Sequence, residues 1–97
     1  GPWIVTPDEF DVRRPQKIQS RINGELRQDS TTDLMIFHVP YVIAELSQGM
    51  TLRPGTIISM GTPAGVGMGF DPPEWLHPGD VVACSIEGIG TLTNTVR

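Results

Sequence analysis

The sequence TIISMGTPAGVG, residues 56–67, joins two patterns of different kinds. Residues 56–60 are mostly apolar and include β-branched side chains, which is typical of a strand. Residues 61–67 contain three glycines in seven positions. Glycine adopts positive φ angles and lets the backbone approach a ligand closely, so the N–H groups of such a loop can converge on an anion. The segment therefore predicts a strand that leads into a glycine-rich, anion-binding loop.

The kind of anion follows from what the loop lacks. It has neither the Gly-Lys-Ser/Thr of a P-loop nor the G-x-G-x-x-G spacing of a dinucleotide site. Pro63 removes one backbone donor, whereas Thr62 adds a hydroxyl. A small carboxylate is therefore a better candidate than a nucleotide. The alternative is a glycine-rich turn that joins two strands without a ligand, and the residues of the loop alone favour that alternative.

Short strands are expected on both sides of this segment. Asn23-Gly24 is the strongest short signal for a β-hairpin, and alternating residues flank it. Pro-Gly turns at residues 54–55 and 78–79 combine the fixed φ of proline with the positive φ of glycine, and each precedes an apolar strand. Further strands are expected at residues 3–5 and 90–96. Five or six short strands and one helix predict an α+β domain that is rich in β-structure.

The expected helix begins at Val39-Pro40, runs to about Gln48 and ends at Gly49. A short helical turn, capped by residues 31–33, is expected just before it. Four apolar residues recur in the helix at helical spacing, and this pattern predicts that one face packs on the sheet. These residues are Val39, Val42, Ile43 and Leu46.

Composition excludes several classes of protein. The 97 residues form one domain at most, and 11 acidic against 7 basic residues without a basic cluster argue against nucleic acid as a partner. No apolar run is long enough to span a bilayer, so no membrane contact is expected. The single cysteine, Cys84, fits a reducing compartment, and the expected location is cytoplasmic. We interpret Cys84 as a buried residue of the core and not as a nucleophile.

Few residues carry recognisable chemistry by themselves. The carboxylates form no H-x-x-E, E-x-E or D-x-D cluster, so no complete metal site is expected in this chain. His38 and His77 are interpreted as surface or capping residues. G-x-S-x-G is absent, which gives no support to acyl-enzyme chemistry. Glu87 follows an apolar strand and precedes a glycine turn, where its carboxylate is expected to accept backbone hydrogen bonds.

Six short motifs in a fixed order nevertheless resemble one known family. They are GPWIVT at residues 1–6, NGELRQD at 23–29, MIF at 35–37, the two Leu-x-Pro-Gly turns taken together, GTPAGVG at 61–67 and IEGIG at 86–90. In this order the motifs resemble the C-terminal part of the fumarylacetoacetate hydrolase family, and the match covers nearly the whole chain. The resemblance implies a mixed β-roll, here a partial domain, in which residues 1–97 are the C-terminal part of a single catalytic domain.

Members of this family are metal-dependent enzymes that act on 2-oxo or 2-hydroxy-dienoate dicarboxylates and acylpyruvates, as in aromatic catabolism. The resemblance implies Mg²⁺ or Mn²⁺ as the cofactor, a small oxo-acid as the ligand, and a homodimer or association with the missing half. It assigns binding of the substrate carboxylate to Thr62 and the backbone around Gly61. Gln28 is a weaker candidate for a substrate contact or a supporting position, and a hydrogen bond within the hairpin is the alternative for its side chain.

The resemblance also implies what this chain does not supply. In the family the metal-binding carboxylates, the general-base histidine with its glutamate, and a catalytic lysine precede the Gly-Pro-Trp element. We therefore expect no catalytic or metal-binding residue in residues 1–97, and no turnover by this chain alone. Hydrolase, isomerase and decarboxylase activities are not distinguished, although the form of the Gly-Thr-Pro loop favours the homoprotocatechuate-type isomerase or related hydrolases. The alternative function is a non-catalytic β-rich binding or dimerisation module derived from such an enzyme.

Overall fold

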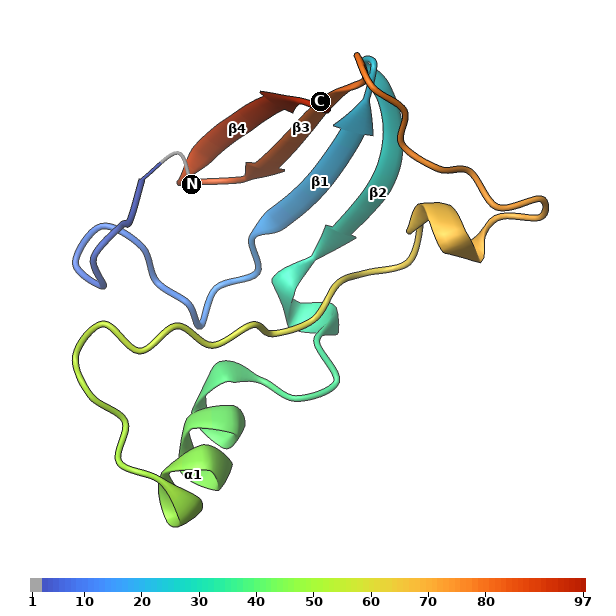
Figure 1. Ribbon diagram of the computed structural model, residues 1–97. Helices are drawn as coiled ribbons and strands as arrows, with labels where there is room; N and C mark the ends of the chain where they lie inside the picture. The colour runs from blue at the N-terminus through green and yellow to red at the C-terminus, as the bar shows by residue number, and fades with distance from the viewer. Residues whose placement is uncertain (1–2) are drawn as a thin grey trace.

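A computed structural model describes residues 3–97, and it contains an antiparallel sheet flanked by long irregular segments (Figure 1). The four strands of this sheet lie in the order β2-β1-β3-β4. The strands are β1 (Lys17–Ile22), β2 (Glu25–Thr31), β3 (Val81–Ile86) and β4 (Gly90–Thr95). The helices of the described residues are α1 (Val39–Gly49) and the 3-10 turns η1 (Thr32–Leu34) and η2 (Gly67–Gly69). The expected β-rich α+β class is confirmed.

The hairpin at Asn23-Gly24 is confirmed, and it contains a bulge. Asn23 has φ 51° and Gly24 has φ 85°, which are the two positive values that a tight hairpin turn of this kind requires. The register pairs Ser20 with Gln28 but Arg21 with Leu26, so Arg27 is an extra residue in β2. A bulge re-aims the side chains beside it. Both bulge-side residues of β2, Arg27 and Gln28, line the hollow on one face of the sheet.

Both Pro-Gly turns are also confirmed. Gly55 has φ 85° and Gly79 has φ 96°. The Thr56 N–H donates to the Arg53 carbonyl at 3.0 Å, and the Asp80 N–H donates to the His77 carbonyl at the same distance. This is the type II geometry expected from proline followed by glycine. The second turn leads into β3, which pairs with β1 and β4.

Two expected strands are wrong for the described chain. Residues 3–5 and 56–60 lie in irregular segments without a strand assignment. A strand is defined by a hydrogen-bonded neighbour, and the described residues offer neither segment a partner. Their apolar side chains are correspondingly exposed, with Ile4 at 95% and Ile57 at 93%. Gly1 and Pro2, which begin the first matched motif, lie outside the described residues.

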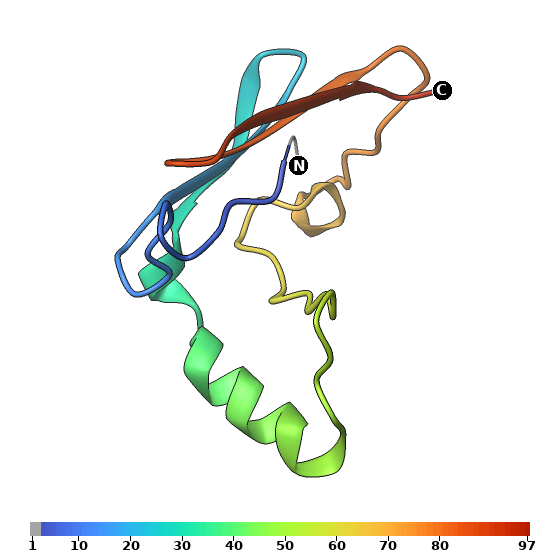
Figure 2. The ribbon, with the colours of Figure 1, turned by 90° about the vertical axis from the view of Figure 1, so that its left-hand side faces the viewer.

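The helix begins and ends as the sequence predicts, but its apolar face does not pack on the sheet. Figures 1 and 2 show α1 at the opposite end of the molecule from the four strands. Ile43 of its apolar face is exposed, and Tyr41 stacks on Phe37 with ring centroids 5.1 Å apart. None of the helices among residues 3–97 has the length and hydrophobicity that a membrane span requires.

The core expected around Cys84 is absent from the described chain. Cys84 is exposed, so its interpretation as a core residue is wrong here. Within residues 3–97 no residue is buried, and large apolar side chains remain accessible on the sheet, on α1 and in the segments between them. The strands are therefore held chiefly by their ladders and by side-chain hydrogen bonds.

Candidate functional site

The glycine-rich segment lies against the hairpin. Gly61 has φ 91° and Gly65 has φ 102°, so both use the left-handed region that the sequence predicts for this loop. At Gly65 a Cβ atom would overlap the backbone carbonyl of Arg27 in β2 and lie 3.2 Å from Cγ of Gln28. Glycine is therefore required there, because it lets the loop backbone touch the backbone of the strand.

Gln28 connects the hairpin to this segment through three hydrogen bonds. Its Oε1 accepts from the Ser20 hydroxyl at 2.8 Å, and this bond crosses from β1 to β2. Its Nε2 donates to Thr62 Oγ1 at 2.8 Å and to the Pro63 carbonyl at 2.8 Å. The hairpin bond that we considered for Gln28 is thus present. The same side chain also meets the residue to which the resemblance assigns carboxylate binding.

The Thr62 hydroxyl can still donate its proton to a ligand in this geometry. Its oxygen accepts from Gln28, and a hydroxyl has one proton to donate besides its acceptor lone pairs. Thr62 and Gly61 are both exposed, so a small ligand can reach them. Chemically, this arrangement presents a fixed neutral donor to an acceptor such as a carboxylate oxygen. Carboxylate binding by Thr62 and Gly61 remains a prediction.

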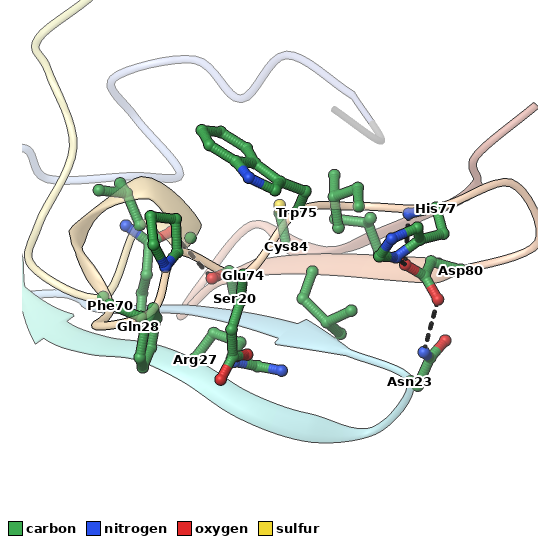
Figure 3. Close-up of a pocket in the computed structure, with 17 residues that line it drawn as sticks. Ser20, Asn23, Arg27, Gln28, Phe70, Glu74, Trp75, His77, Asp80 and Cys84 are labelled. Atoms are coloured by element: carbon green, nitrogen blue, oxygen red, sulfur yellow. Dashed lines mark hydrogen bonds and ion pairs between the residues drawn. The ribbon is translucent and has the colours of Figure 1, made fainter.

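A hollow of about 740 Å³ lies beside these residues, between the sheet and residues 65–77 (Figure 3). Gln28 lines it, whereas Thr62 and Gly61 lie outside it. Polar and aromatic side chains from both walls face this space, among them Ser20, Asn23, Arg27, Phe70, Glu74, Trp75, His77, Asp80 and Cys84. Gln28 therefore lines the hollow and also contacts Thr62, and it does so from the part of β2 beside the bulge.

Arg27 connects strand β2 to residues 65–77, which form the wall of the hollow opposite the sheet. Its guanidinium forms an ion pair with Glu74, and its Cζ lies 5.3 Å from the centroid of the Phe70 ring. A guanidinium over an aromatic face is attractive because the ring face is negative. No sequence pattern indicated this role for Arg27 or Glu74. The bulge that turns Arg27 toward them depends on strand register, for which the sequence carries no local signal.

Asp80 lies at the end of the hollow opposite Gln28, where its carboxylate connects two segments of the chain (Figure 3). Its carboxylate accepts from the His77 N–H at 2.7 Å and from Asn23 Nδ2 at 2.8 Å, the latter drawn as a dashed line in Figure 3. These hydrogen bonds, the one from the His77 backbone first, lower the pKa of Asp80, and partial burial opposes them weakly. The hairpin turn is thereby fastened to the start of β3.

Glu87 behaves as the sequence predicts. Its carboxylate Oε2 accepts from the Lys17 N–H at 3.3 Å, at the opposite end of the sheet from Asp80. This contact places Glu87 in a structural role, where it closes the end of the β1–β3 ladder.

The acidic and histidine side chains of residues 3–97 form no group of three or more that could hold a metal ion. The described residues thus do not by themselves fit a site for Mg²⁺ or Mn²⁺, whose usual ligands are several convergent oxygens. What these residues offer is hydrogen-bond donors at Thr62 and the neighbouring backbone.

Comparison with known proteins identifies the family. The family model described as "Fumarylacetoacetate (FAA) hydrolase C-terminal" matches residues 1–97. The chain therefore belongs to the fumarylacetoacetate hydrolase family, as the six motifs indicated. Because the match spans the whole chain, the glycine-rich segment and the hairpin are both parts of the family's C-terminal region.

Three solved structures show the same fold. A fumarylacetoacetate hydrolase (EaFAH) from psychrophilic Exiguobacterium antarcticum is 52% identical with a TM-score of 0.95 over 100% of this chain. A 2-hydroxyhepta-2,4-diene-1,7-dioate isomerase from Mycobacterium marinum is 45% identical with a TM-score of 0.84 over 99%. A maleylpyruvate hydrolase from Sphingobium sp. SYK-6, in complex with manganese(II) ion and pyruvate, is 35% identical with a TM-score of 0.87 over 99%.

The matched region is a fraction of each of these proteins. This chain covers 35% of the first structure and 34% of the other two, so it spans about a third of the length of its relatives. The relatives whose reactions are named are hydrolases or isomerases, and one of them binds a divalent metal ion. The fold seen here is accordingly the partial domain that the sequence predicts.

Proposed function

We propose that this chain is the carboxylate-binding part of a metal-dependent enzyme that acts on acylpyruvates or on 2-oxo and 2-hydroxy-dienoate dicarboxylates. The observation that supports the proposal most strongly is the hydrogen bond from Gln28 Nε2 to Thr62 Oγ1. It leaves the Thr62 proton available to a ligand beside the left-handed turn at Gly61. The maleylpyruvate hydrolase that shares this fold was solved with pyruvate, which is a 2-oxo carboxylate of the class we propose.

The proposed role of Thr62 is to hold the carboxylate while a bond changes elsewhere in the substrate. In hydrolysis of an acylpyruvate, the oxygen of water bonds to the distal carbonyl carbon and the C3–C4 bond breaks. The electron pair of that bond passes to the 2-oxo acid fragment as an enolate, which takes a proton at C3 to give pyruvate. Isomerisation moves a proton without breaking the carbon chain. In both reactions Thr62 donates to the carboxylate before and during the chemical step, and such an interaction chiefly lowers KM.

The proposed cofactor is Mg²⁺ or Mn²⁺, and it would supply electrostatic stabilisation of the developing enolate. Support comes from the manganese(II) ion in the maleylpyruvate hydrolase that shares this fold. The residues of this chain bind and orient the carboxylate, and the groups that move protons and hold the ion are proposed to lie in the part of the family domain that this chain does not match.

The comparisons name two reactions, hydrolysis and isomerisation, each with substrates of the proposed class. We propose the isomerase or a related hydrolase, because the matched structures include a dienedioate isomerase at 45% identity and a hydrolase at 52%. The proposed location is cytoplasmic, which fits the unpaired Cys84.

A second candidate is supported by the exposed apolar side chains. Ile36 at 89% and Ile57 at 93% exposure are typical of residues covered by a partner. A homodimer, or association with further chain of the same family domain, would cover them. A β-rich binding or dimerisation module without catalysis has the same need, so exposure alone does not separate it from the enzyme.

Turnover separates the two candidates. The protein at its natural length is incubated with acetylpyruvate and Mg²⁺ or Mn²⁺, and the loss of ultraviolet absorbance is followed while products are identified by NMR. We expect metal-dependent turnover, with pyruvate and acetate as the products of hydrolysis; a rearranged dienedioate is the product if 2-hydroxyhepta-2,4-diene-1,7-dioate is supplied and isomerised. Residues 1–97 alone serve as the control and are expected to be inactive. A natural-length protein that self-associates but turns over neither substrate would favour the binding module.

A further inference from the structure

The three hydrogen bonds of Gln28 have a fixed direction. A side-chain amide has one acceptor oxygen and one nitrogen with two donor protons. The Pro63 carbonyl only accepts, so the group that lies 2.8 Å from it must be the nitrogen. The same nitrogen lies 2.8 Å from Thr62 Oγ1, and the amide oxygen then faces the Ser20 hydroxyl. The alternative orientation would set two acceptors against each other at Pro63.

This direction determines what Thr62 can do. Both protons of Nε2 are used, one on Thr62 and the other on the Pro63 carbonyl. Thr62 Oγ1 is therefore an acceptor toward Gln28, and its own proton points to another partner. Without Gln28, the hydroxyl could rotate and donate to any nearby carbonyl. With Gln28 in place, the Thr62 hydroxyl directs its proton away from Gln28 and can donate it to a bound ligand.

We infer that Gln28 is a positioning residue, which commits the Thr62 hydroxyl to donate to a carboxylate and thereby selects ligands that only accept. This inference rests on the proposed function, because it concerns the carboxylate that Thr62 is proposed to hold. Ser20 supports the arrangement from β1 through its bond to Oε1. Its contribution is smaller, since the Pro63 carbonyl fixes the amide without it.

Substitutions of Gln28 test the direction of the bonds. Gln28→Glu keeps the size of the side chain but replaces the donor by a charged acceptor. This carboxylate accepts the hydrogen bond from the Thr62 hydroxyl and repels an anion. Gln28→Met keeps the length and removes both donors. Pyruvate is the probe, measured by titration calorimetry with Mn²⁺ present in the natural-length protein. We expect binding to weaken about 3- to 10-fold in Gln28→Met, about 10-fold or more in Gln28→Glu, and less than about 3-fold in Ser20→Ala.

The pH profile distinguishes positioning from a merely structural role. Lowering the pH protonates the introduced carboxyl of Gln28→Glu, which then has a proton to donate again. Pyruvate affinity of this variant is therefore expected to rise as pH falls toward about 5, while the wild-type affinity stays nearly constant over the same range. Loss of stability without this pH dependence would indicate that Gln28 only holds the loop in place.

The outcomes separate the inference from the proposed function. If wild type binds pyruvate and Thr62→Val weakens it, but both Gln28 variants bind like wild type, the inference is wrong and the proposed function stands. If neither wild type nor Thr62→Val binds pyruvate, the proposed function fails and the inference fails with it. Should both Gln28 variants unfold, NMR of the wild type decides: the Gln28 amide protons are expected to exchange with solvent more slowly than those of the exposed Gln48. Equal exchange would overturn the inference.

Discussion

Gln28 Nε2 lies 2.8 Å from Thr62 Oγ1, although the two residues are 34 positions apart in the sequence. The bond joins the edge strand β2 to the glycine-rich segment, and it is repeated at the next residue by the bond to the Pro63 carbonyl. Two site residues that the family resemblance indicated separately are thus parts of one hydrogen-bonded unit. This contact, more than the hollow beside it, defines where a carboxylate is proposed to bind.

Removal of the Thr62 hydroxyl should raise KM more than it lowers kcat. Thr62→Val keeps the shape of the side chain but leaves no donor for the carboxylate. Because a hydrogen bond to a charged group is worth about 1.5–3 kcal/mol, KM for acetylpyruvate is expected to rise about 10- to 100-fold. Thr62→Ser keeps the hydroxyl and is expected to remain within about 3-fold of wild type. Steady-state kinetics of the natural-length protein provide the measurement, and equal KM values for the valine and serine variants would remove Thr62 from the binding site.

Gly65 should not tolerate a side chain. Its φ of 102° is strained for other residues, and a Cβ atom would overlap the Arg27 carbonyl. Gly65→Ala is therefore expected to destabilise the fold by more than about 2 kcal/mol, measured by urea unfolding. Gly49 at the end of α1 is the matched control, because it has open space around it and no positive φ. Gly49→Ala is expected to leave stability unchanged or to raise it by up to about 1 kcal/mol. Similar stability of the two variants would contradict the close approach of loop and strand.

The Arg27–Glu74 ion pair should couple the loop to the sheet. The Arg27 side chain is 21% exposed and that of Glu74 is 48% exposed, so solvent screens the pair in part. A double-mutant cycle with Arg27→Met and Glu74→Gln is expected to give a coupling free energy of about 1 kcal/mol, and this value should fall as salt is added. Arg27→Met should cost more than Glu74→Gln, since it also removes the contact with the Phe70 ring. Strict additivity at low salt would show that the pair contributes nothing.

Acidification should loosen the turn at Asp80. The hydrogen bonds from His77 and Asn23 favour the carboxylate, so its pKa in the folded chain is lowered from the ordinary value of 3.8. The stabilisation is therefore fully present above the unfolded pKa and is lost as pH falls through the folded pKa. Carbon NMR of the Asp80 carboxyl is expected to show titration below the ordinary value.

Asp80→Asn is the control for this effect, because its amide does not titrate. Between about pH 6 and pH 3, wild type is expected to lose more unfolding free energy than this variant. The hydrogen-bond explanation is wrong if Asp80 titrates at or above its ordinary pKa.

Features set by neighbouring residues could be predicted from the sequence. The hairpin at Asn23-Gly24, both Pro-Gly turns and the ends of α1 depend on the φ preferences of a few adjacent residues. The strand expected at residues 56–60 was wrong because pairing needs a partner distant in sequence, and hydrophobicity does not name that partner. The burial expected for Cys84 was wrong although its strand is paired on both sides, because burial also requires other residues that cover that face of the sheet, and a local sequence pattern does not identify them.

The same distinction between local and long-range features applies to the candidate site. The glycines and Thr62 could be recognised from the motif and the family resemblance. The contact between Gln28 and Thr62 could not be recognised in this way, because it depends on the bulge at Arg27 and on the path of a segment 34 positions further along the chain. The part played by Ser20 was missed altogether, since a serine in a strand has no distinguishing local pattern.

A crystal structure of the natural-length protein with Mn²⁺ and pyruvate would test carboxylate binding by Thr62 most directly. We predict that a carboxylate oxygen of pyruvate lies about 2.5–3.0 Å from Thr62 Oγ1 while Gln28 Nε2 keeps its bond to the same oxygen atom of Thr62. A carboxylate bound elsewhere, with the Thr62 hydroxyl donating to protein or to solvent, would contradict the proposed function and the role inferred for Gln28.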